Sequence, residues 1–360
     1  MSNEMSDGAS TRSFRIADRW IGAGRPCFIM AEVALAHDGS LGLAHAFIDA
    51  VARTGADCVK FQTHIASAES TADEPFRVHF SRQDATRYAY WERTAFTAEQ
   101  WRGLAEHAAD AGLIFLSSPF SEAAVDLLDS IGVPAWKIGS GEVGNDLLLR
   151  RAAATAKPVL LSSGLSDLAE LDRAVALVRN AGADVAVFQC TSRYPCPPEA
   201  LGLEQVRALA HRYACSAGLS DHSGTIYAGL GAVTLGAHML EVHVTLSRDM
   251  FGPDVVASLT IPELRSLVEG TRFLERAIAS PVDKSSVGED ALALRAIFTK
   301  RLVAARRLAA GTVLTAQDIA AKKPGNGLPS QRLDEVLGRM LRRPLEADEP
   351  LRPEDLEVLP

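Results

Sequence analysis

Two lysines of this sequence lie inside short apolar stretches, where a charged side chain is unusual. Lys60 is enclosed in VKF and Lys137 in WKI, and a lysine is seldom buried without a partner. Two ammonium groups that converge with several hydroxyl groups would form a pocket for a phosphate or a carboxylate. Two other interpretations stay open. One lysine could form a Schiff base, as in aldolases, or both could belong to structural ion pairs.

Two histidines follow consecutive apolar stretches, His222 in SDHS and His243 in EVHV. Strand alternation places Glu241 and His243 on the same side of their stretch. Imidazoles on neighbouring strand ends could hold one divalent metal, with Glu32, Glu241 or Asp254 nearby. Catalytic or structural roles are as common for a pair of histidines, so these alternatives stay open.

Eight short apolar runs alternate with longer amphipathic segments. The runs are 27–33, 56–62, 113–118, 135–140, 158–163, 185–191, 215–220 and 238–244. Several of the intervening segments begin at Ser, Thr or Asp and end at Gly, which is typical of capped helices. Continuous apolar runs separated by helices predict a buried parallel sheet. Eight such units in about 250 residues favour a (β/α)₈ TIM barrel, with a doubly wound open sheet as the alternative.

Polar side chains close or directly follow all eight of these runs. In a barrel, all strand ends meet at the C-terminal face, where barrel enzymes carry their active sites. A single serine after a strand is more often a helix cap, but polar ends on eight strands favour a shared site. We therefore expect the following residues at this face: Glu32, Lys60, Gln62, Ser118, Lys137, Ser140, Ser162, Ser220, His222 and His243.

The pattern of alternating runs stops near residue 280. We expect a disordered tail over 1–14, a barrel over 15–281, a polar linker over 282–298 and a small α/β module over 299–360. A module of about 60 residues has a marginal core by itself, so we expect it to dock onto another surface.

Composition excludes several classes of protein. The chain has 360 residues, 47% hydrophobic and 23% charged, with a net charge of −8, as expected for a soluble globular protein. There is no basic stripe for nucleic acid, no apolar run of the ~18 residues that a membrane span needs, and no apolar signal segment. The five scattered cysteines form no CxxC pair, which favours a reducing, cytoplasmic location.

Ten short motifs occur in one order along the chain. They are MAEVALAHDG (30–39), GADCVKFQTH (55–64), FLSSPF (115–120), KIGSGE (137–142), LSSG (161–164), QCTSRYPCPPE (189–199), GLSDHS (218–223), LGAHMLEVH (235–243), GPDVVAS (252–258) and KPGNG (323–327). With these motifs, the sequence resembles the sialic acid synthase family, which includes N-acetylneuraminate, legionaminate and pseudaminate synthases. The resemblance runs from about residue 15 to about residue 357.

The resemblance implies a TIM barrel followed by a C-terminal antifreeze-like (SAF) domain. It also implies a homodimer with swapped domains, in which the SAF domain covers the partner's active site. The implied reaction condenses phosphoenolpyruvate with an open-chain N-acyl hexosamine similar to N-acetylmannosamine. Its products are a sialic-acid-like nine-carbon keto acid and phosphate. The implied cofactor is Mn²⁺, with Mg²⁺ or Co²⁺ as alternatives.

The resemblance also assigns roles to the matching residues. The metal ligands would be His222 and His243, and the catalytic residues would be Glu32, Asp254 and His222, with Glu32 as the acid/base group. Phosphoenolpyruvate would contact Lys60, Ser118, Lys137, Ser140, Ser162 and Ser220. The sugar would contact Gln62, Ser192, Tyr194, Asp254, Lys323 and Asn326.

Some positions depart from the family pattern. Val242 replaces a usual cation, Lys323 replaces a usual arginine, and the segment 66–94 does not resemble the usual substrate loop. Lysine lacks the fork of an arginine, so the replacement is not equivalent. The departures leave the identity of the sugar open. They also keep two alternatives in view, namely another phosphoenolpyruvate-condensing or Schiff-base barrel enzyme and a non-catalytic sugar-phosphate-binding protein.

Overall fold

The computed structural model describes residues 12–76, 78–323 and 326–357. The chain forms two compact units that divide between Ser280 and Pro281, and each unit has its own hydrophobic core. Most of the tail predicted for 1–14 lies outside the described residues, and Phe14 already begins the first strand. Within the described residues, no helix has the length and apolar character that crossing a membrane requires.

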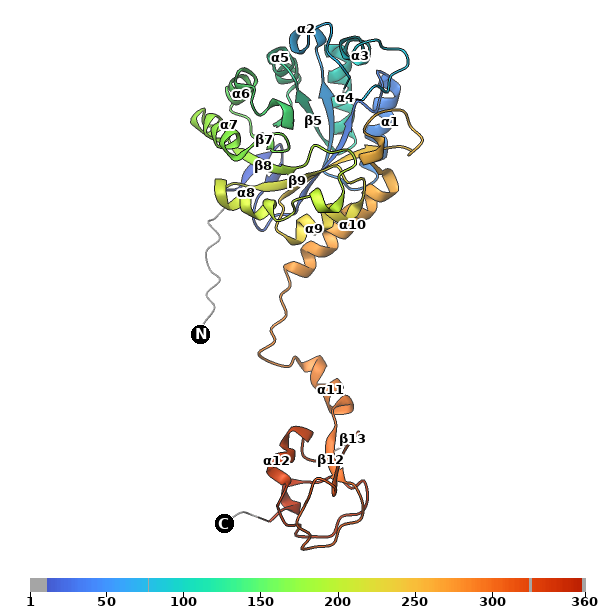
Figure 1. Cartoon of the computed structure of the whole chain (residues 1–360), viewed down its shortest axis with the longest axis vertical. Coiled ribbons are helices and arrows are strands. Elements are labelled where there is room, and N and C mark those ends of the chain that lie inside the picture. The colour runs from blue at the N-terminus through green and yellow to red at the C-terminus, as the bar shows by residue number, and fades with distance from the viewer. Residues whose placement is uncertain (1–11, 77, 324–325, 358–360) are drawn as a thin grey trace. The chain divides into compact units, whose positions relative to one another are not determined.

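The first unit is the predicted barrel (Figure 1). Its eight parallel strands match the eight apolar runs. They are β3 (Phe28–Ala34), β4 (Cys58–Thr63), β5 (Ile114–Pro119), β6 (Trp136–Ile138), β7 (Val159–Ser162), β8 (Val185–Cys190), β9 (Ala217–Asp221) and β10 (Met239–Thr245). The hydrogen-bonded order is β5-β4-β3-β10-β9-β8-β7-β6. The first and last strands of that order also lie against each other, so the sheet is a nearly closed TIM-like barrel. The fold class is confirmed.

Helices surround the strands. They are α1 (Leu41–Ala52), α4 (Ala98–Asp110), α5 (Glu122–Ile131), α6 (Asp146–Ala153), α7 (Leu168–Asn180), α8 (Gln205–Tyr213), α9 (Ile226–Thr234) and α10 (Ile261–Ile278). The predicted caps position several of them. Ser40 and Ser121 accept hydrogen bonds from backbone N–H groups of the first turn, and Thr97 and Asp167 form capping boxes with the third helical residue. Such caps satisfy N–H groups that have no partner within the helix.

A long excursion separates β4 from α4. It carries two short helices, α2 (Ala66–Glu69) and α3 (Arg87–Thr94). Its aromatic side chains, including Tyr90 and Trp91, form a separate small hydrophobic cluster over this part of the barrel.

Two layers of core arise from strand alternation. Outward-facing residues pack against the helices, while inward-facing residues fill the barrel. The hairpin of β1 (Phe14–Ile16) and β2 (Arg19–Ile21) adds Phe14, Ile16 and Ile21 to the inner cluster. On five strands, the inward residue two positions further along is polar, since side chains of one face recur every second residue. The pairs are Met30 and Glu32, Cys58 and Lys60, Leu116 and Ser118, Leu160 and Ser162, and Met239 and Glu241.

The second unit contains α11 (Glu289–Phe298), the antiparallel strands β12 (Arg301–Ala304) and β13 (Ile319–Lys322), and α12 (Leu333–Val336). Its small core is built mainly from leucines. Helix α11 occupies the second half of the predicted linker 282–298. That stretch is therefore not a plain polar connection, although the helix has no buried residue.

Candidate active site

Two lysines and two glutamates form a buried charged cluster inside the barrel. Lys60 Nζ lies 2.6 Å from Glu32 Oε2 and 3.7 Å from Glu241 Oε2. Lys137 Nζ lies 3.2 Å from Glu241 Oε1. Each of the four side chains is at most 6% exposed. The structure therefore brings both predicted lysines together, and it adds Glu241 as the carboxylate that bridges them.

The hydroxyl groups expected around the lysines are present. Lys60 Nζ donates to Ser118 Oγ at 2.9 Å, and Lys137 Nζ donates to Ser162 Oγ at 2.6 Å. Ser220 Oγ donates to Glu241 Oε1 at 3.1 Å. Each of these serines lies at the end of a strand, so the barrel orients all three towards the charged cluster.

Burial controls the ionisation of this cluster. Burial raises the pKa of Glu32 to about 7, which Lys60 only partly offsets. Burial also acts to raise the pKa of Glu241, but Lys137 and Lys60 outweigh it and lower that pKa to about 2. Burial alone would lower the pKa of Lys60, but Glu241 and Glu32 raise it above its ordinary value. Glu241 is therefore the permanent counter-ion of the cluster, whereas Glu32 can exchange a proton near neutral pH.

One oxygen of Glu32 is also without a partner. Glu32 Oε1 makes no hydrogen bond to the described residues, although the side chain is 1% exposed. A buried carboxylate oxygen is costly to leave unsatisfied. The atom is therefore suited to accept a hydrogen bond from a substrate or a water.

The two predicted histidines lie next to each other near the ends of β9 and β10, with their rings tilted by 56°. The ring centroids of His222 and His243 are 5.3 Å apart. His222 Nδ1 contacts the Thr191 carbonyl at 2.8 Å, and a carbonyl only accepts, so Nδ1 carries the proton and Nε2 a lone pair. That Nε2 lies 2.8 Å from the hydroxyl of Tyr194. Burial, followed by His243, lowers the pKa of His222 to about 4, so its imidazole is neutral at pH 7.

These histidines fit a divalent metal. A neutral imidazole whose other nitrogen donates to a backbone carbonyl is the usual form of a histidine ligand. Asp254 Oδ2 lies 3.9 Å from His243 Nδ1 and can orient that ring. Within the described ranges, no three His, Cys, Asp or Glu side chains are grouped as metal ligands. An ion held here would complete its coordination with water or substrate, as catalytic metals do.

A pocket of about 520 Å³ opens beside the histidines. Its lining includes the predicted sugar-contacting residues Gln62, Ser192, Tyr194 and Asp254, together with Ser140 and His243. Ser140 Oγ and Ser192 Oγ lie 2.9 Å apart on one side of it. Ser140 therefore lies at the pocket wall. The other serines predicted to contact phosphoenolpyruvate, Ser118, Ser162 and Ser220, lie beside the buried charged cluster.

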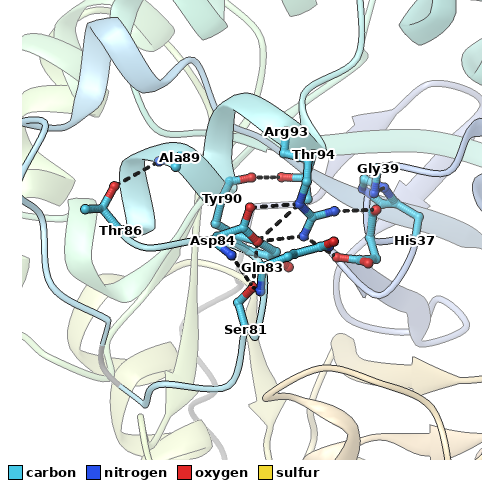
Figure 2. A network of polar contacts seen from close by, with 11 residues as sticks. His37, Gly39, Ser81, Gln83, Asp84, Thr86, Ala89, Tyr90, Arg93 and Thr94 are labelled. Carbon is cyan, nitrogen blue, oxygen red and sulfur yellow. Dashed lines mark hydrogen bonds and ion pairs between the residues drawn. The ribbon is translucent and has the colours of Figure 1, made fainter.

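The excursion 66–94 forms another side of this pocket, and the sequence did not indicate this role. Arg93 binds the excursion to the loop after β3, as Figure 2 shows. Its guanidinium donates to Asp84 Oδ1 and Oδ2, and also to the side chain and the carbonyl of Asp38. Gly39 makes this approach possible, because a Cβ there would lie 2.8 Å from the Arg93 carbonyl oxygen.

Val242 and Lys323, which departed from the family pattern, and the predicted sugar contact Asn326 have definite places. Val242 is buried in the outer core against the helices, so its side chain points away from the site. Lys323 and Asn326 are exposed residues of the second unit, and Lys323 Nζ lies 5.3 Å from the ring of Phe298 in that unit. Both residues belong to the second unit, and their contact with a sugar stays a prediction.

Comparisons with known proteins identify both units. The model of the NeuB family matches residues 47–283, and the model of the SAF domain matches residues 300–357. The N,N'-diacetyllegionaminic acid synthase of Campylobacter jejuni is 32% identical over 90% of this chain and 98% of its own length. The human N-acetylneuraminate-9-phosphate synthase is 31% identical over 93% of this chain and 94% of its own length.

A solved structure agrees with these relatives. The N-acetylneuraminic acid synthetase of Leptospira borgpetersenii, crystallised with citrate, superposes with a TM-score of 0.69 at 27% identity. It covers 79% of this chain and 96% of its own. The two sequence relatives cover 90% and 93% of this chain, and both are named as synthases. The chain therefore belongs to the NeuB family and is an enzyme, a synthase whose barrel is followed by a SAF domain.

Proposed function

We propose that this enzyme is a nonulosonic acid synthase that condenses phosphoenolpyruvate with an N-acyl hexosamine, giving a nine-carbon keto acid and phosphate. One observation carries the proposal. Two buried lysines, each hydrogen-bonded to a serine of the adjacent strand, lie on the same inward face as His243, which lines the sugar-sized pocket. An anion site beside such a pocket suits one substrate that carries phosphate and a second that is a polyol.

The bonds that form and break in this condensation define roles for specific groups. C3 of phosphoenolpyruvate attacks the aldehyde carbon of the open-chain sugar, and C2 becomes electron-poor. Water adds to C2, and the C2–O bond to phosphate then breaks, leaving a ketone. One proton of that water ends on the former aldehyde oxygen, and the other leaves with phosphate. Lys60 and Lys137 would stabilise the phosphate as negative charge develops on it.

Glu32 is suited to the proton transfers. Its pKa of about 7 lets it accept and return a proton near neutral pH, and Oε1 offers an acceptor inside the barrel. Asp254 lines the pocket and would contact the sugar or the attacking water. His222 and His243 would hold the divalent metal, for which we propose Mn²⁺. That ion supplies Lewis-acid polarisation of the aldehyde when bound.

We further propose the family's swapped homodimer for this chain. The support is the SAF domain, whose exposed Lys323 and Asn326 would reach the partner's sugar pocket. The dimer would explain why a module with such a small core accompanies the barrel.

A Schiff-base aldolase is less well supported. Such a mechanism needs a lysine that loses its proton easily, whereas the carboxylates Glu241 and Glu32 raise the pKa of Lys60. Lys137 is likewise held by Glu241 at 3.2 Å. Borohydride with pyruvate should therefore trap no adduct on either lysine.

The direct test is release of phosphate from phosphoenolpyruvate with a panel of N-acyl hexosamines, with Mn²⁺ and with EDTA. We expect metal-dependent release that requires a sugar, with a keto acid of matching mass. Absence of release with every sugar, from a folded protein with bound Mn²⁺, would contradict the proposal. It would favour a different acceptor or a sugar-phosphate-binding role.

A further inference from the structure

The outer part of the pocket is lined by an unusual number of aromatic side chains. We call Phe76, Phe80, Tyr90, Trp91 and Phe251 the aromatic wall; all five line the pocket. Their rings touch in sequence, with centroids 5.5 Å apart for Phe80 and Phe251, 5.1 Å for Phe80 and Tyr90, and 5.3 Å for Tyr90 and Trp91. The wall is therefore one continuous apolar surface.

The wall lies towards the outside of the barrel. Tyr90 and Trp91 are buried, whereas Phe251 is 44% exposed. The aldehyde carbon of an acceptor must face the lysines and histidines inside the barrel, because the new bond forms there. The carbons at the other end of the sugar would then point towards the aromatic wall.

The charges of the described residues around the wall disfavour an anionic group. Four carboxylates line the pocket, namely Glu69, Glu74, Glu142 and Asp254. Among the described lining residues, Arg87 is the only lysine or arginine, and its Nη1 is already 3.1 Å from Glu74 Oε1. A phosphate on the far end of the sugar would meet these carboxylates without a cation in reserve among those residues.

The wall is also held in place. Arg93 lies two residues after Trp91 in the sequence. Its guanidinium donates hydrogen bonds to both Asp84 and Asp38 (Figure 2). Trp91 Nε1 donates to Glu74 Oε2 at 3.1 Å, and the Trp91 ring stacks on His64 with centroids 3.7 Å apart. A wall fixed on both sides can discriminate between substituents by shape and polarity, because it does not rearrange around each of them.

We infer that the aromatic wall selects an acceptor hexosamine that is uncharged and apolar at the end far from its aldehyde, such as a 6-deoxy sugar, and rejects a 6-phosphorylated one. The inference rests on the proposed synthase function and adds the class of acceptor. The relatives' names include both a phosphorylated and an unphosphorylated product, so family membership leaves this choice undecided.

Three matched acceptors test the inference with the full-length protein, phosphoenolpyruvate and Mn²⁺. They are N-acetylmannosamine, its 6-deoxy analogue and its 6-phosphate. We expect kcat/KM for the 6-deoxy sugar to exceed that for N-acetylmannosamine about 10-fold, as for one hydroxyl group against an apolar surface. We expect kcat/KM for the 6-phosphate to be at least about 100-fold lower than kcat/KM for the 6-deoxy sugar.

Binding of the same sugars, measured by calorimetry with Mn²⁺ but without phosphoenolpyruvate, separates the two proposals. If no sugar is turned over but the affinities follow the expected order, the synthase function fails and the selectivity of the wall stands. If the 6-phosphate binds as tightly as the 6-deoxy sugar, or N-acetylmannosamine binds more tightly, the selectivity is wrong. Absence of binding by all three would also overturn it.

A pair of variants assigns the selectivity to the wall itself. Phe80→Gln places an amide at the centre of the wall, whereas Phe80→Leu keeps the position apolar. We expect Phe80→Gln to reduce the ratio of kcat/KM for the 6-deoxy sugar to kcat/KM for N-acetylmannosamine to about 2-fold or less. We expect Phe80→Leu to keep this ratio near its original value. An unchanged preference in Phe80→Gln, with unchanged thermal melting, would remove the wall from the explanation.

Discussion

Glu241 bridges Lys137 and Lys60, with its two oxygens 3.2 Å and 3.7 Å from the two ammonium groups. Two buried cations would repel each other without a shared counter-ion. Glu241 therefore offsets the charge of both lysines, and it competes for them with any anionic substrate. Under the proposed function, phosphoenolpyruvate would have to displace this carboxylate in part from the two lysines.

The Glu241→Gln variant tests this competition. Glutamine keeps the size of the side chain and an oxygen for Ser220, but it removes one negative charge between the lysines. We expect KM for phosphoenolpyruvate and the inhibition constant of phosphate both to fall about 3- to 10-fold. We expect kcat to fall as well, because product phosphate would leave more slowly. Steady-state kinetics with added phosphate measure all three.

The exposed Glu106 supplies the matched control, and Glu106→Gln should leave every one of these constants unchanged. Weaker binding of phosphoenolpyruvate in Glu241→Gln would mean that the carboxylate supports the substrate directly rather than competing with it.

The proposed metal site predicts that replacing either histidine weakens binding of Mn²⁺. Both rings meet at the ends of β9 and β10, and the Thr191 carbonyl fixes the tautomer of His222. We expect His222→Asn and His243→Asn each to raise the Kd for Mn²⁺ by about 100-fold or more, since even an indirect contact to a metal site costs 10- to 100-fold. Electron paramagnetic resonance of unbound Mn²⁺ gives the Kd. His211→Asn, at an exposed helix position, should bind Mn²⁺ normally, and normal binding by all three variants would disprove the assignment.

The buried pair of Lys60 and Glu32 makes a prediction about stability. Lys60→Met leaves Glu32 and Glu241 with one ammonium fewer, and loss of one partner of a buried pair costs about 3–5 kcal/mol. Adding Glu32→Gln removes the unpaired charge, so the double variant should unfold at a higher urea concentration than Lys60→Met alone. If the two losses simply add, the residues are not coupled and the ion pair is not a stabilising unit.

The hydrogen bonds from Arg93 to Asp84 predict that the stability of the fold depends on pH. Hydrogen bonds from Arg93 hold the pKa of Asp84 below its ordinary value. A carboxyl whose pKa is lower in the folded state stabilises the fold above the unfolded pKa of about 3.9. That contribution disappears as the pH falls through the folded pKa. We expect Asp84→Asn to lower the free energy of unfolding by about 1–3 kcal/mol at pH 7.

The pH dependence of the Asp84→Asn effect tests whether the carboxylate charge is responsible. The difference between Asp84→Asn and the unchanged protein should be constant above about pH 5 and shrink below pH 3.9. Urea unfolding at several pH values measures it. A difference that does not change down to pH 2 would show that the carboxylate charge is not what Arg93 recognises.

Much of the barrel and the site could be predicted because each depends on local patterns. A buried parallel strand must be apolar on both faces, so eight apolar runs were visible as strands. The polar residues at their ends, such as Lys60 and Ser162, stood out because charge and hydroxyl groups are rare in such runs. The meeting of strand ends at one face then followed from barrel geometry alone.

Pairings between distant residues were not predictable. Whether Lys137 is neutralised by a substrate or by a carboxylate depends on the register between β6, β7 and β10, which no single stretch of sequence contains. For the same reason Glu241 was visible as a polar strand residue but not as the bridge between two lysines. Val242 illustrates the opposite case. Strand alternation puts it on the face opposite to Glu241 and His243, and the structure buries it there against the helices.

The amino-acid sequence by itself therefore determined which elements form, which of their ends are polar, and which chemical groups meet at one face. The tertiary structure decided how those charges are paired, and it showed that the excursion 66–94 closes one side of the pocket. The physical reason is that periodicity and capping act within a few residues, whereas ion pairs and aromatic contacts join residues that only folding brings together. Arg93 and Asp38 are joined in this way across 55 positions.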